Sequence, residues 1–598
     1  MKLFDCDKVK ITGGYIADKQ KLNRKVTINA VYDRFCDSGR IGAFDFDWIE
    51  GKPNKPHYFY DSDVAKWMEG AAYILHDNPD SELKGRVERL IDKIEEHQGG
   101  DGYFNIYFTV CEPEKRFKDR DKHELYCAGH LFEAAVAYAR ATGETRFLKC
   151  MEKYADYIYR VFAIEKSAAF VTPGHEEIEL ALIEMYRYTK VKKYLELALF
   201  FLNNRGKCES EKTPYNQSHL PVREQTEAVG HAVRAVYLYS AMADCAFETG
   251  DNELKRACFA LFEDIVTKKM YVTGGLGSTP IGEAFTHAYD LPNNDAYAET
   301  CAGIGLMFFA KRLLRLENRA EFADVIERVF YNGVLSGLSL DGKAFFYENP
   351  LEITLSEHFE SVYGKRRLPI TQRVECFKCS CCPPNLNRLL PKLSEYIYGL
   401  ESDTLFVNQF AESVLSDGKT ECKMHTDYPR SGTVKISACG VKNVAVRIPS
   451  WCAKFTADRE YTVKDGYAVM ESGGEITLRF DMSPFAVYAD SRVVHDTHRL
   501  CIQAGPVVYC AEGIDNCEVS ENLHALCVPH DFDYRIEYDE SIGLNTLNIS
   551  GFRIQSAKNT LYSRDKGETE PVTIRLIPYS AFANRGESDM LVWLHAKY

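Results

Sequence analysis

The sequence predicts a multidomain α+β protein, in which an α-helical toroid, an (α/α)6 barrel, is followed by β-sandwich domains. Two patterns support this fold class. Over the first two-thirds of the chain, apolar residues recur every three or four positions in paired segments joined by short polar turns, which is typical of helical hairpins. After about Gly399 the apolar residues fall in short, β-branched or alternating segments broken by Gly, Asp and Pro, which is typical of antiparallel strands.

The helical hairpins follow one another along the chain. They are predicted over residues 71–94, 130–159, 178–202, 231–266 and 298–330. Their turns fall near Asn78, Thr142, Thr189, Thr249 and Glu317. A further helix over 385–400 and helices from the N-terminal region allow about six helical pairs. Such pairs can stack as an open solenoid or close into a ring. We expect the closed toroid, because its loops would converge on one central cavity.

The strand segments after the toroid indicate antiparallel sandwich material in two parts. Short β-branched or alternating segments occupy residues 433–440, 441–451, 475–482, 485–494, 499–513 and 572–582. We therefore expect a helical catalytic domain over 1–400, a β-sandwich domain over 401–515, and a second β-rich region over 516–598.

Composition excludes several classes of function. Of the 598 residues, 45% are hydrophobic, which is sufficient for a large buried core. The 73 Lys and Arg residues against 87 Asp and Glu give a net charge of −14, so neither nucleic acid nor an anionic membrane is an expected partner. The N-terminal MKLFDCDKVK lacks the apolar stretch of a signal peptide, and no segment approaches the roughly 18 apolar residues of a membrane span. We expect a cytoplasmic protein.

The most informative motif is VECFKCSCCPPNLNRLL, which spans 374–390. It contains Cys376, Cys379, Cys381 and Cys382, four of the chain's 20 cysteines. Several thiols close together in a reducing compartment indicate a thiophilic metal, and zinc suits them best. Two alternatives stay open at this point. Some of these cysteines can be small buried residues beside a helix start, or the zinc can be purely structural, although the usual second Cys or His pair is missing.

A second motif lies in residues 274–306 and carries three residues of chemical interest. Glu299 and Cys301 stand two positions apart at a predicted helix start, where a non-helical backbone lets both side chains reach one ion. Glu283 precedes them in a loop. Either glutamate taken alone is better explained as a solvated surface residue.

Three histidines occupy related places in the repeats. His130, His175 and His231 lie at or near the N-terminal ends of predicted hairpin helices, and in a toroid these ends could converge. A single histidine is more often a hydrogen-bonded structural residue. Three at related positions indicate recognition of a polar ligand rather than metal binding, since no H-x-x-x-H pair is present.

Taken together, these motifs resemble glycoside hydrolase family 127, the cysteine-dependent, zinc-containing β-L-arabinofuranosidases. The resemblance rests on long segments in a fixed order between about residues 40 and 515. The segments are ELYCAGHLFEAA, GHEEIELAL, GHAVRA, GGLGSTPIGEAFT, AYAETCAGIGL, FFYENPLE, CFKCSCCPPNLNR, RIPSW and QAGPVVYCAEG. The family implies an (α/α)6 catalytic barrel followed by β-sandwich domains, in agreement with the pattern above.

The resemblance also implies roles for individual residues. The zinc ligands would be Glu299, Cys301, Cys381 and Cys382. Cys381 would be the nucleophile and Glu283 the acid/base. The sugar-contacting residues would include His130, His175, His231 and Tyr347. Cys379 would lie near the metal. One departure is visible in GRIGAFDF, residues 39–46, where Ala43 replaces the family's usual Asn.

The implied activity is that of a retaining exo-glycosidase that releases terminal β-L-arabinofuranose from oligosaccharides or glycoconjugates. In such enzymes a nucleophile attacks the anomeric carbon and an acid protonates the departing oxygen. Two alternatives stay open: the same chemistry on another unusual plant-derived sugar, and a non-catalytic carbohydrate-binding protein with structural zinc. The sequence leaves the formation of a homo-oligomer undecided.

Overall fold

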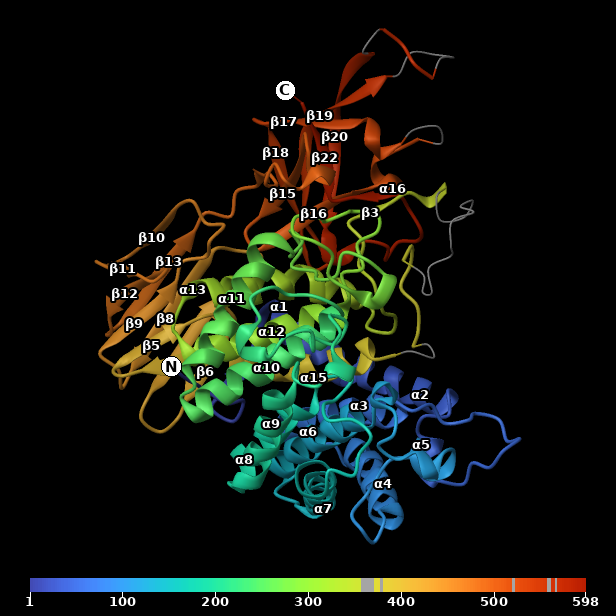
Figure 1. Cartoon of the computed structure of the whole chain (residues 1–598). Helices are drawn as coiled ribbons and strands as arrows, with labels where there is room; N and C mark the ends of the chain where they lie inside the picture. Colours follow the sequence, from blue (N-terminus) through green and yellow to red (C-terminus); the bar gives the residue numbers. More distant parts are fainter. Residues whose placement is uncertain (357–369, 377–379, 519–521, 556–560, 565–566, 598) are drawn as a thin grey trace.

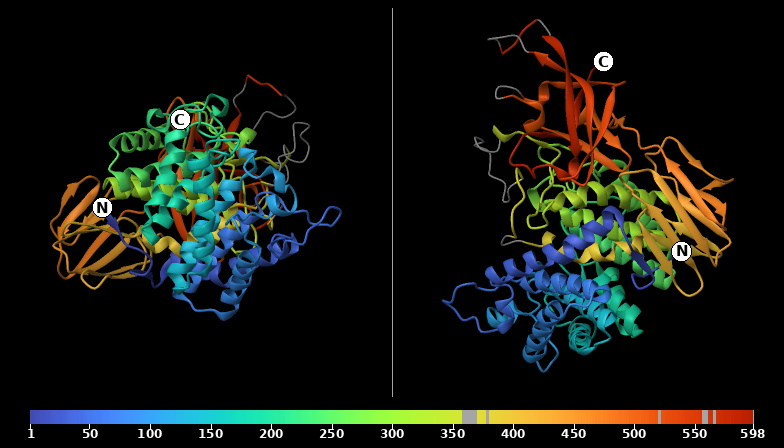
Figure 2. Two further views of the ribbon diagram at one scale, coloured as in Figure 1. Left: turned by 60° about the horizontal axis from the view of Figure 1, so that its bottom comes forward. Right: turned by 180° about the vertical axis from the view of Figure 1, so that it is seen from behind.

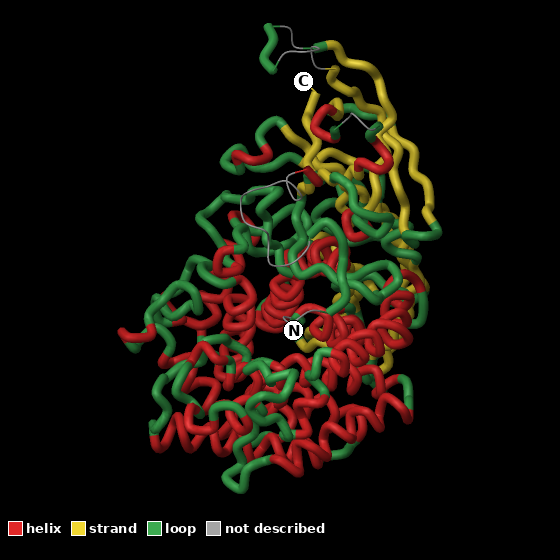
Figure 3. Tube along the Cα trace, turned by 90° about the vertical axis from the view of Figure 1, so that its right-hand side faces the viewer, coloured by secondary structure: helices red, strands yellow, loops and turns green. Residues whose placement is uncertain are grey.

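The computed structural model shows a helical region with two β-rich regions packed against it (Figure 1). It describes residues 1–356, 370–376, 380–518, 522–555, 561–564 and 567–597. The helices occupy one end of the molecule and most of the strands the other end and one side, as the turned views agree (Figures 2 and 3). The expected order of a helical N-terminal part and a β-rich C-terminal part is therefore confirmed.

Inner helices of the described chain contact one another in a closed order. α3 contacts α6, and the contacts continue through α8, α10 and α12 to α15, which contacts α3 again. These helices are α3 (Tyr60–Asp77), α6 (Glu124–Thr142), α8 (Ile178–Thr189), α10 (Ala232–Thr249), α12 (Thr300–Leu316) and α15 (Cys382–Leu389). Segments more than 300 residues apart in the sequence thus lie side by side, which brings the cysteine motif onto the helical region.

Each of the first five inner helices, from α3 to α12, is followed along the chain by an outer helix. The outer helices are α4 (Ser81–His97), α7 (Arg146–Tyr159), α9 (Lys192–Asn204), α11 (Asn252–Lys268) and α13 (Ala320–Arg328). α1 (Gly14–Leu22) and α2 (Ile28–Asp37) precede α3, and α2 packs on α3 and α15. The short helices α5 (Tyr107–Val110) and α16 (Gly513–Asn516) lie outside this series.

The predicted turns coincide with the ends of the inner helices. α6 and α10 end at Gly143 and Gly250, whose backbones have φ of 75° and 71°, a left-handed conformation that glycine adopts without strain. Two of the outer helices begin with a side-chain cap. The Asp80 carboxylate accepts hydrogen bonds from two backbone N–H groups at the start of α4, and Asp251 does the same for α11. The local sequence therefore defines these turns.

The described residues form two six-stranded sheets beside the helices. The first has the order β1 (Lys2–Leu3), β4 (Tyr398–Glu401), β5 (Thr404–Val407), β9 (Asn443–Arg447), β12 (Tyr467–Glu471) and β11 (Thr462–Lys464). The second has the order β10 (Phe455–Ala457), β13 (Glu475–Phe480), β8 (Thr433–Cys439), β7 (Glu421–Thr426), β6 (Ser413–Ser416) and β2 (Val9–Ile11). Strand β13 alternates buried Ile476 and Leu478 with exposed Glu475 and Arg479, as one covered face requires.

In the described part of the chain, a ten-stranded sheet contains the C-terminal strands. Its order is β14 (Phe485–Val487), β15 (Arg499–Ala504), β22 (Trp593–Lys597), β17 (Leu526–Pro529), β19 (Leu544–Gln555), β20 (Glu568–Pro578), β16 (Val507–Glu512), β21 (Met590–Leu591) and β3 (Glu352–Ile353), with β18 (Tyr534–Asp539) paired to β19.

This pairing changes the domain boundaries expected from the sequence. β1 and β2 pair with β4 and β6, so the first residues of the chain belong to the six-stranded sheets. A boundary at 515/516 would divide the ten-stranded sheet, because β15 and β16 pair with β22 and β20. We therefore propose that the C-terminal region begins near residue 484.

Membrane insertion finds no support in the described helices, none of which combines the length and the apolar character needed to cross a bilayer.

Candidate active site and metal centre

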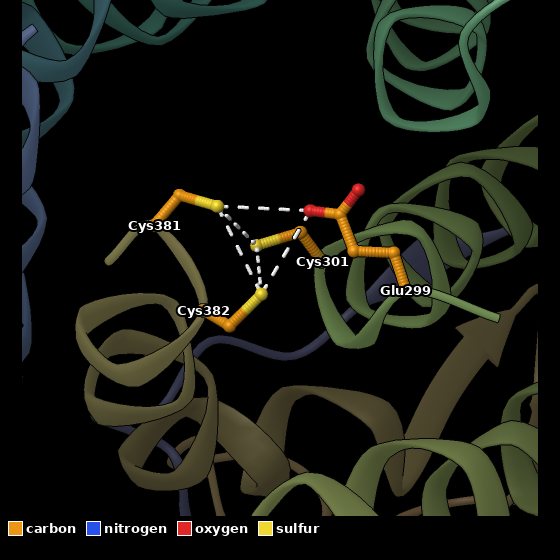
Figure 4. Close-up of side chains that lie close together, drawn as sticks. All are labelled: Glu299, Cys301, Cys381 and Cys382. Carbon is orange, nitrogen blue, oxygen red and sulfur yellow. Dashed lines mark hydrogen bonds between the residues drawn. The ribbon is translucent and has the colours of Figure 1, made fainter. Parts of the chain in front are cut away.

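A cluster of three thiols and one carboxylate lies where α12 and α15 meet (Figure 4). The ligand atoms of Glu299, Cys301, Cys381 and Cys382 all lie within 4.8 Å of one another. The Sγ atom of Cys301 is 3.2 Å from that of Cys382 and 3.6 Å from that of Cys381. The Glu299 Oε1 atom is 3.6 Å from the Cys381 sulfur and 3.8 Å from the Cys382 sulfur. Together these four residues form a candidate metal site.

Two helix starts position the cluster. Glu299 is the extended residue before α12, with φ −62° and ψ 135°, and Cys301 lies in the first turn of that helix. Cys381 and Cys382 stand at the start of α15, where the two following prolines are tolerated because first-turn N–H groups lack helical partners. The positive ends of two helix dipoles therefore meet at the cluster and favour anionic ligands.

Burial and sulfur contacts set the protonation of the cluster. Burial alone would raise the pKa of Cys301, but its hydrogen-bonding interactions with the Cys381 and Cys382 sulfurs outweigh burial and lower this pKa to about 6. Burial and the neighbouring sulfurs raise the pKa of the Cys382 thiol well above its usual value. The low pKa of Cys301 places a thiolate among buried groups, which is an arrangement that a bound cation stabilises.

The other cysteines of the motif have different positions. Cys376 is buried outside the cluster, and burial raises its pKa to about 12, so it stays a protonated thiol. Cys379 lies outside the described residues. Within the cluster, Glu299, Cys301 and Cys382 are buried, whereas Cys381 is partly exposed. Cys381 is therefore the sulfur of this group that an incoming molecule can reach.

Glu283 lies beside the cluster, on a tight turn. Gly282 and Glu283 both have left-handed backbones, with φ of 71° and 56°, and a non-glycine residue in this conformation often marks a functional site. Ala284 pairs with the backbone of His231, which fixes the turn against the start of α10. The carboxylates of Glu283 and Glu299, together with the His231 ring, lie within 4.8 Å of one another.

His231 and Tyr297 orient the Glu283 carboxylate. The Nδ1 atom of His231 accepts a hydrogen bond from the backbone N–H of Arg234, so Nε2 carries the proton. Nε2 lies 2.7 Å from Oε2 of Glu283 and donates to it. The buried Tyr297 also hydrogen-bonds to Glu283. The Glu283 side chain is 22% exposed, so it combines a fixed orientation with access from solvent.

The three predicted histidines form a connected group near these residues. The ring centroids of His130 and His175 lie 4.5 Å and 4.2 Å from that of Tyr126, and His175 is 5.6 Å from His231. The Oη atom of Tyr347 is 3.4 Å from the Cys381 sulfur. His231 caps α10 and His175 precedes α8 as expected. The position of His130 differs, because α6 begins at Glu124 and places His130 inside the helix.

Burial keeps the imidazoles neutral. Burial lowers the pKa of His130, His175 and His231, and nearby cationic groups lower the first two further, whereas Glu283 partly opposes the effect at His231. Each neutral ring presents one donor and one acceptor, a set that suits the hydroxyl groups of an uncharged polyol.

Comparison with known proteins identifies the family. The model described as "Beta-L-arabinofuranosidase, GH127 catalytic domain" matches residues 8–395, and the model of the glycoside hydrolase family 127 C-terminal domain matches residues 484–595. The chain belongs to glycoside hydrolase family 127. The family expected from the sequence is thus confirmed, and the chain is a glycoside hydrolase.

Characterised relatives of this family 127 protein align over nearly the whole chain. It is 35% identical to a non-reducing end β-L-arabinofuranosidase of Bifidobacterium longum subsp. longum, over 90% of this chain and 89% of that protein. Its structure resembles the crystal structure of a family 127 β-L-arabinofuranosidase from Geobacillus stearothermophilus T6, with a TM-score of 0.91, 39% identity, and coverage of 98% and 100% of the two chains. A second family 127 β-arabinofuranosidase structure gives a TM-score of 0.88 at 33% identity, with coverage of 100% of this chain and 98% of that one.

Sequence reasoning missed several residues of this family 127 site. Tyr126 contacts two of the histidines, and its hydroxyl accepts a hydrogen bond from the buried Lys66 at 3.1 Å. Glu177 is fully buried, with Oε1 3.0 Å from Nδ1 of His130. One signal was available. Tyr126 and His130 stand four residues apart and therefore lie on one helix face.

Proposed function

We propose that this chain is a retaining exo-glycosidase that hydrolyses terminal β-L-arabinofuranosides. The observation that carries the proposal is the Glu299–Cys301–Cys381–Cys382 cluster with a second carboxylate, Glu283, held beside it by a neutral histidine. A structural metal site has no use for a partly exposed acid of this kind. The choice of glycone rests on the activity named for the Bifidobacterium and Geobacillus proteins.

We also propose that the ring of helices is an (α/α)6 toroid. The cyclic contacts from α3 round to α15 support it, as does the outer helix after each of the first five inner helices. The pair formed by α1 and α2 would supply the outer layer beside α15, with which α2 is in contact.

Zinc is the metal that we propose for the cluster. Four tetrahedral ligands with metal–sulfur bonds of about 2.3 Å have sulfur–sulfur edges of about 3.8 Å. The observed sulfur separations of 3.2, 3.6 and 3.8 Å and the carboxylate–sulfur separations of 3.6 and 3.8 Å are close to such a set. Glu299, Cys301, Cys381 and Cys382 would hold the ion, which when bound favours the thiolate form of the ligating cysteines.

The chain's own residues would perform two displacements at the anomeric carbon. In the first, the Cys381 sulfur forms a bond to this carbon while Glu283 donates its proton to the glycosidic oxygen, and the C–O bond to the leaving alcohol breaks. In the second, Glu283 removes a proton from water, the water oxygen bonds to the anomeric carbon, and the C–S bond breaks. Two inversions at one carbon give retention.

His130, His175, His231 and Tyr347 would hold the sugar during both steps. The neutral imidazoles can exchange hydrogen bonds with ring hydroxyls without presenting a charge. Tyr347, 3.4 Å from the Cys381 sulfur, would orient the glycone above the nucleophile. His231 contributes in a second way, because it also fixes Glu283.

The proposed function is tested with a panel of p-nitrophenyl glycosides that includes both anomers of L-arabinofuranose. We expect hydrolysis of the β-L-arabinofuranoside and little or none of the α anomer. NMR of the first product should show the β configuration. Selective hydrolysis of a different glycoside with retention would reassign the sugar and keep the chemistry, whereas inversion would exclude the two-step mechanism.

A further inference from the structure

Glu177 is a buried carboxyl group that the proposed mechanism does not use. Its Oε1 atom lies 3.0 Å from Nδ1 of His130, and both side chains are 0% exposed. We propose that Glu177 is a positioning residue, which in its protonated form fixes His130 as the Nδ1–H tautomer and leaves Nε2 to accept a hydrogen bond from one hydroxyl group of the sugar. The inference rests on the function proposed above, and it assigns a direction of hydrogen bonding that this function leaves open.

Three helices bring the group together. His130 and Glu133 lie one turn apart in α6, with Nδ1 and Oε2 3.8 Å apart, and Glu177 is the residue before α8. Arg388 in α15 donates from one nitrogen to Glu133 and also, at 2.8 Å, to Glu69 of α3. The side chains of Arg388 and Glu69 are 2% exposed, so water does not screen this pair. A buried guanidinium therefore holds Glu133 in place.

The contact between the two glutamates requires a proton. The side chains of Glu133 and Glu177 hydrogen-bond with each other, and a carboxyl group donates only when it is protonated. The Arg388 guanidinium outweighs burial and holds the pKa of Glu133 below its usual range. Burial and the negative charge of Glu133 raise the pKa of Glu177 well above its usual range. The proton therefore belongs to Glu177, and Glu133 is the carboxylate that accepts the hydrogen bond.

A protonated Glu177 determines which nitrogen of His130 carries hydrogen. Its hydroxyl group donates to Glu133, so Oε1 is a carbonyl oxygen that can only accept, and Nδ1–H is the group that donates to it. Burial and the nearby charges of Lys66 and Arg388 lower the pKa of His130 and keep the ring neutral, so Nε2 is bare. Neither ring nitrogen has another hydrogen-bond partner among the residues that the structure describes. A buried acceptor without a partner is costly, and a sugar hydroxyl group would satisfy it.

A shared proton explains this group better than a second metal ion. The ligand atoms of His130, Glu133 and Glu177 lie within 4.8 Å of one another, a spacing that a metal ion also allows. However, Glu133 already binds the Arg388 guanidinium, and Lys66 adds a second buried positive charge near His130. A divalent cation would be repelled by both groups.

The kinetic test uses p-nitrophenyl β-L-arabinofuranoside and its three monodeoxy analogues, each of which lacks one possible donor to Nε2. We expect Glu177→Ala and His130→Ala to lower kcat/KM on the parent glycoside roughly ten- to a hundredfold. Both variants should lose much less on one analogue, and it should be the same analogue for both. The double variant should lose no more than His130→Ala alone, because Glu177 acts through this ring.

Two further variants separate positioning from structural support. Glu177→Gln keeps an acceptor oxygen for Nδ1–H and gains an N–H donor for Glu133, so it should recover most of the activity that Glu177→Ala loses. Glu124→Ala removes another buried glutamate of α6, which hydrogen-bonds to Tyr103 instead. Any loss in Glu124→Ala should be equal on all four substrates and additive with that of His130→Ala.

NMR of protein that carries isotope-labelled histidine reads the tautomer directly, without a substrate. The signals of His130 are identified by their absence from His130→Ala. The wild-type and Glu177→Gln proteins should show a protonated Nδ1 and a bare Nε2, and Glu177→Ala should lose this preference. A proton on Nε2 of the wild-type protein, with or without one on Nδ1, would overturn the inference.

The kinetic outcomes are equally decisive. Equal losses on all four substrates, or a double variant that is worse than His130→Ala, would overturn the inference and make Glu177 a structural residue. Glu177→Gln as impaired as Glu177→Ala would also overturn it, and so would a second metal ion per chain that disappears with Glu177→Ala. If the wild-type protein hydrolyses none of the four arabinofuranosides, the proposed function fails, whereas the NMR measurement still confirms or overturns the tautomer assigned to His130.

Discussion

Replacing Glu283 with Gln removes one proton from the proposed mechanism and changes little else. The two side chains have the same shape, and the Gln amide oxygen can still accept from Nε2 of His231, which lies 2.7 Å from the carboxylate. Glu283 is 22% exposed, so the substitution buries no new unpaired group and should leave the stability of the fold intact. A loss of activity would therefore report the missing proton rather than a displaced side chain.

The size of the loss should depend on the leaving group. General acid–base catalysis contributes about 10²- to 10⁴-fold in rate, which corresponds to about 3–5 kcal/mol of barrier. A disaccharide has a poor leaving group and should lose this full factor with Glu283→Gln. An activated aryl glycoside leaves without protonation, so its first step should slow by less than about tenfold. Its second step still needs a base, and a glycosyl-enzyme should therefore accumulate.

Stopped-flow release of nitrophenol and mass spectrometry of digested protein measure these two steps. The expected result is a burst of nitrophenol and one anhydropentose on the peptide that contains Cys381. Cys381→Ser serves as the comparison, because a hydroxyl is a weaker nucleophile and should give no burst with any substrate. Finding the added mass on Glu299 would refute the assignment of the nucleophile and reduce the thiols to scaffolding.

The remaining predictions concern the metal, the sugar and stability. Purified protein should contain one zinc per chain, and Cys301→Ser or Cys382→Ser should lower this content in elemental analysis; wild-type protein without stoichiometric metal would contradict the site. His130→Ala should weaken turnover while the zinc content stays constant, and loss of zinc would make this histidine a ligand. Burial raises the pKa of Glu124 from 4.5 to about 8, so the folded protein retains a proton that the unfolded chain releases. The contribution of this carboxyl to the free energy of unfolding should therefore fall as pH rises from about 4.5 to 8. Urea unfolding at a series of pH values should show a flatter pH dependence for Glu124→Gln than for the wild-type protein. The same pH dependence in both proteins would contradict the prediction.

Helical hairpins and the cysteine motif were predictable because their signals are local. The turns after Thr142 and Thr249 carry glycine at the position where the backbone becomes left-handed. The start of α15 is marked by two prolines directly after Cys381 and Cys382. Each of these signals lies within a few neighbouring residues, so it can be recognised in a single sequence.

The features that were missed depend on distant partners. β1 and β2 contain two and three residues, and they become strands because β4 and β6 offer free edges roughly 400 residues later in the chain. The sheet to which each strand of the β-rich part belongs could not be predicted for a related reason. Strands on both sides of residue 515 have the same alternating pattern, and only their pairing assigns them to one sheet. Nothing in the local sequence specifies which edge a short strand will join.

The contact between Cys301 and Cys382 follows from the order of the inner helices. In a series of antiparallel hairpins every inner helix begins at the same end of the bundle, so the residues at these starts converge. α10 begins after His231, α12 begins after Glu299, and α15 begins after Cys381. The step from α12 to α15 spans about 80 residues of sequence but joins neighbouring helices.

This arrangement also explains the division of roles at the site. The exposed acid lies on a turn at the start of α10, and the buried ligands lie at the starts of α12 and α15. His130, placed further along α6, reaches the group from within the helix instead of from its start. A substitution at the start of an inner helix should therefore affect catalytic activity more than stability. A substitution on an outer helix should affect stability more than activity. In the proposed mechanism the helix starts would hold the metal ligands, and the turn bearing Glu283 would supply the acid that a substrate must reach.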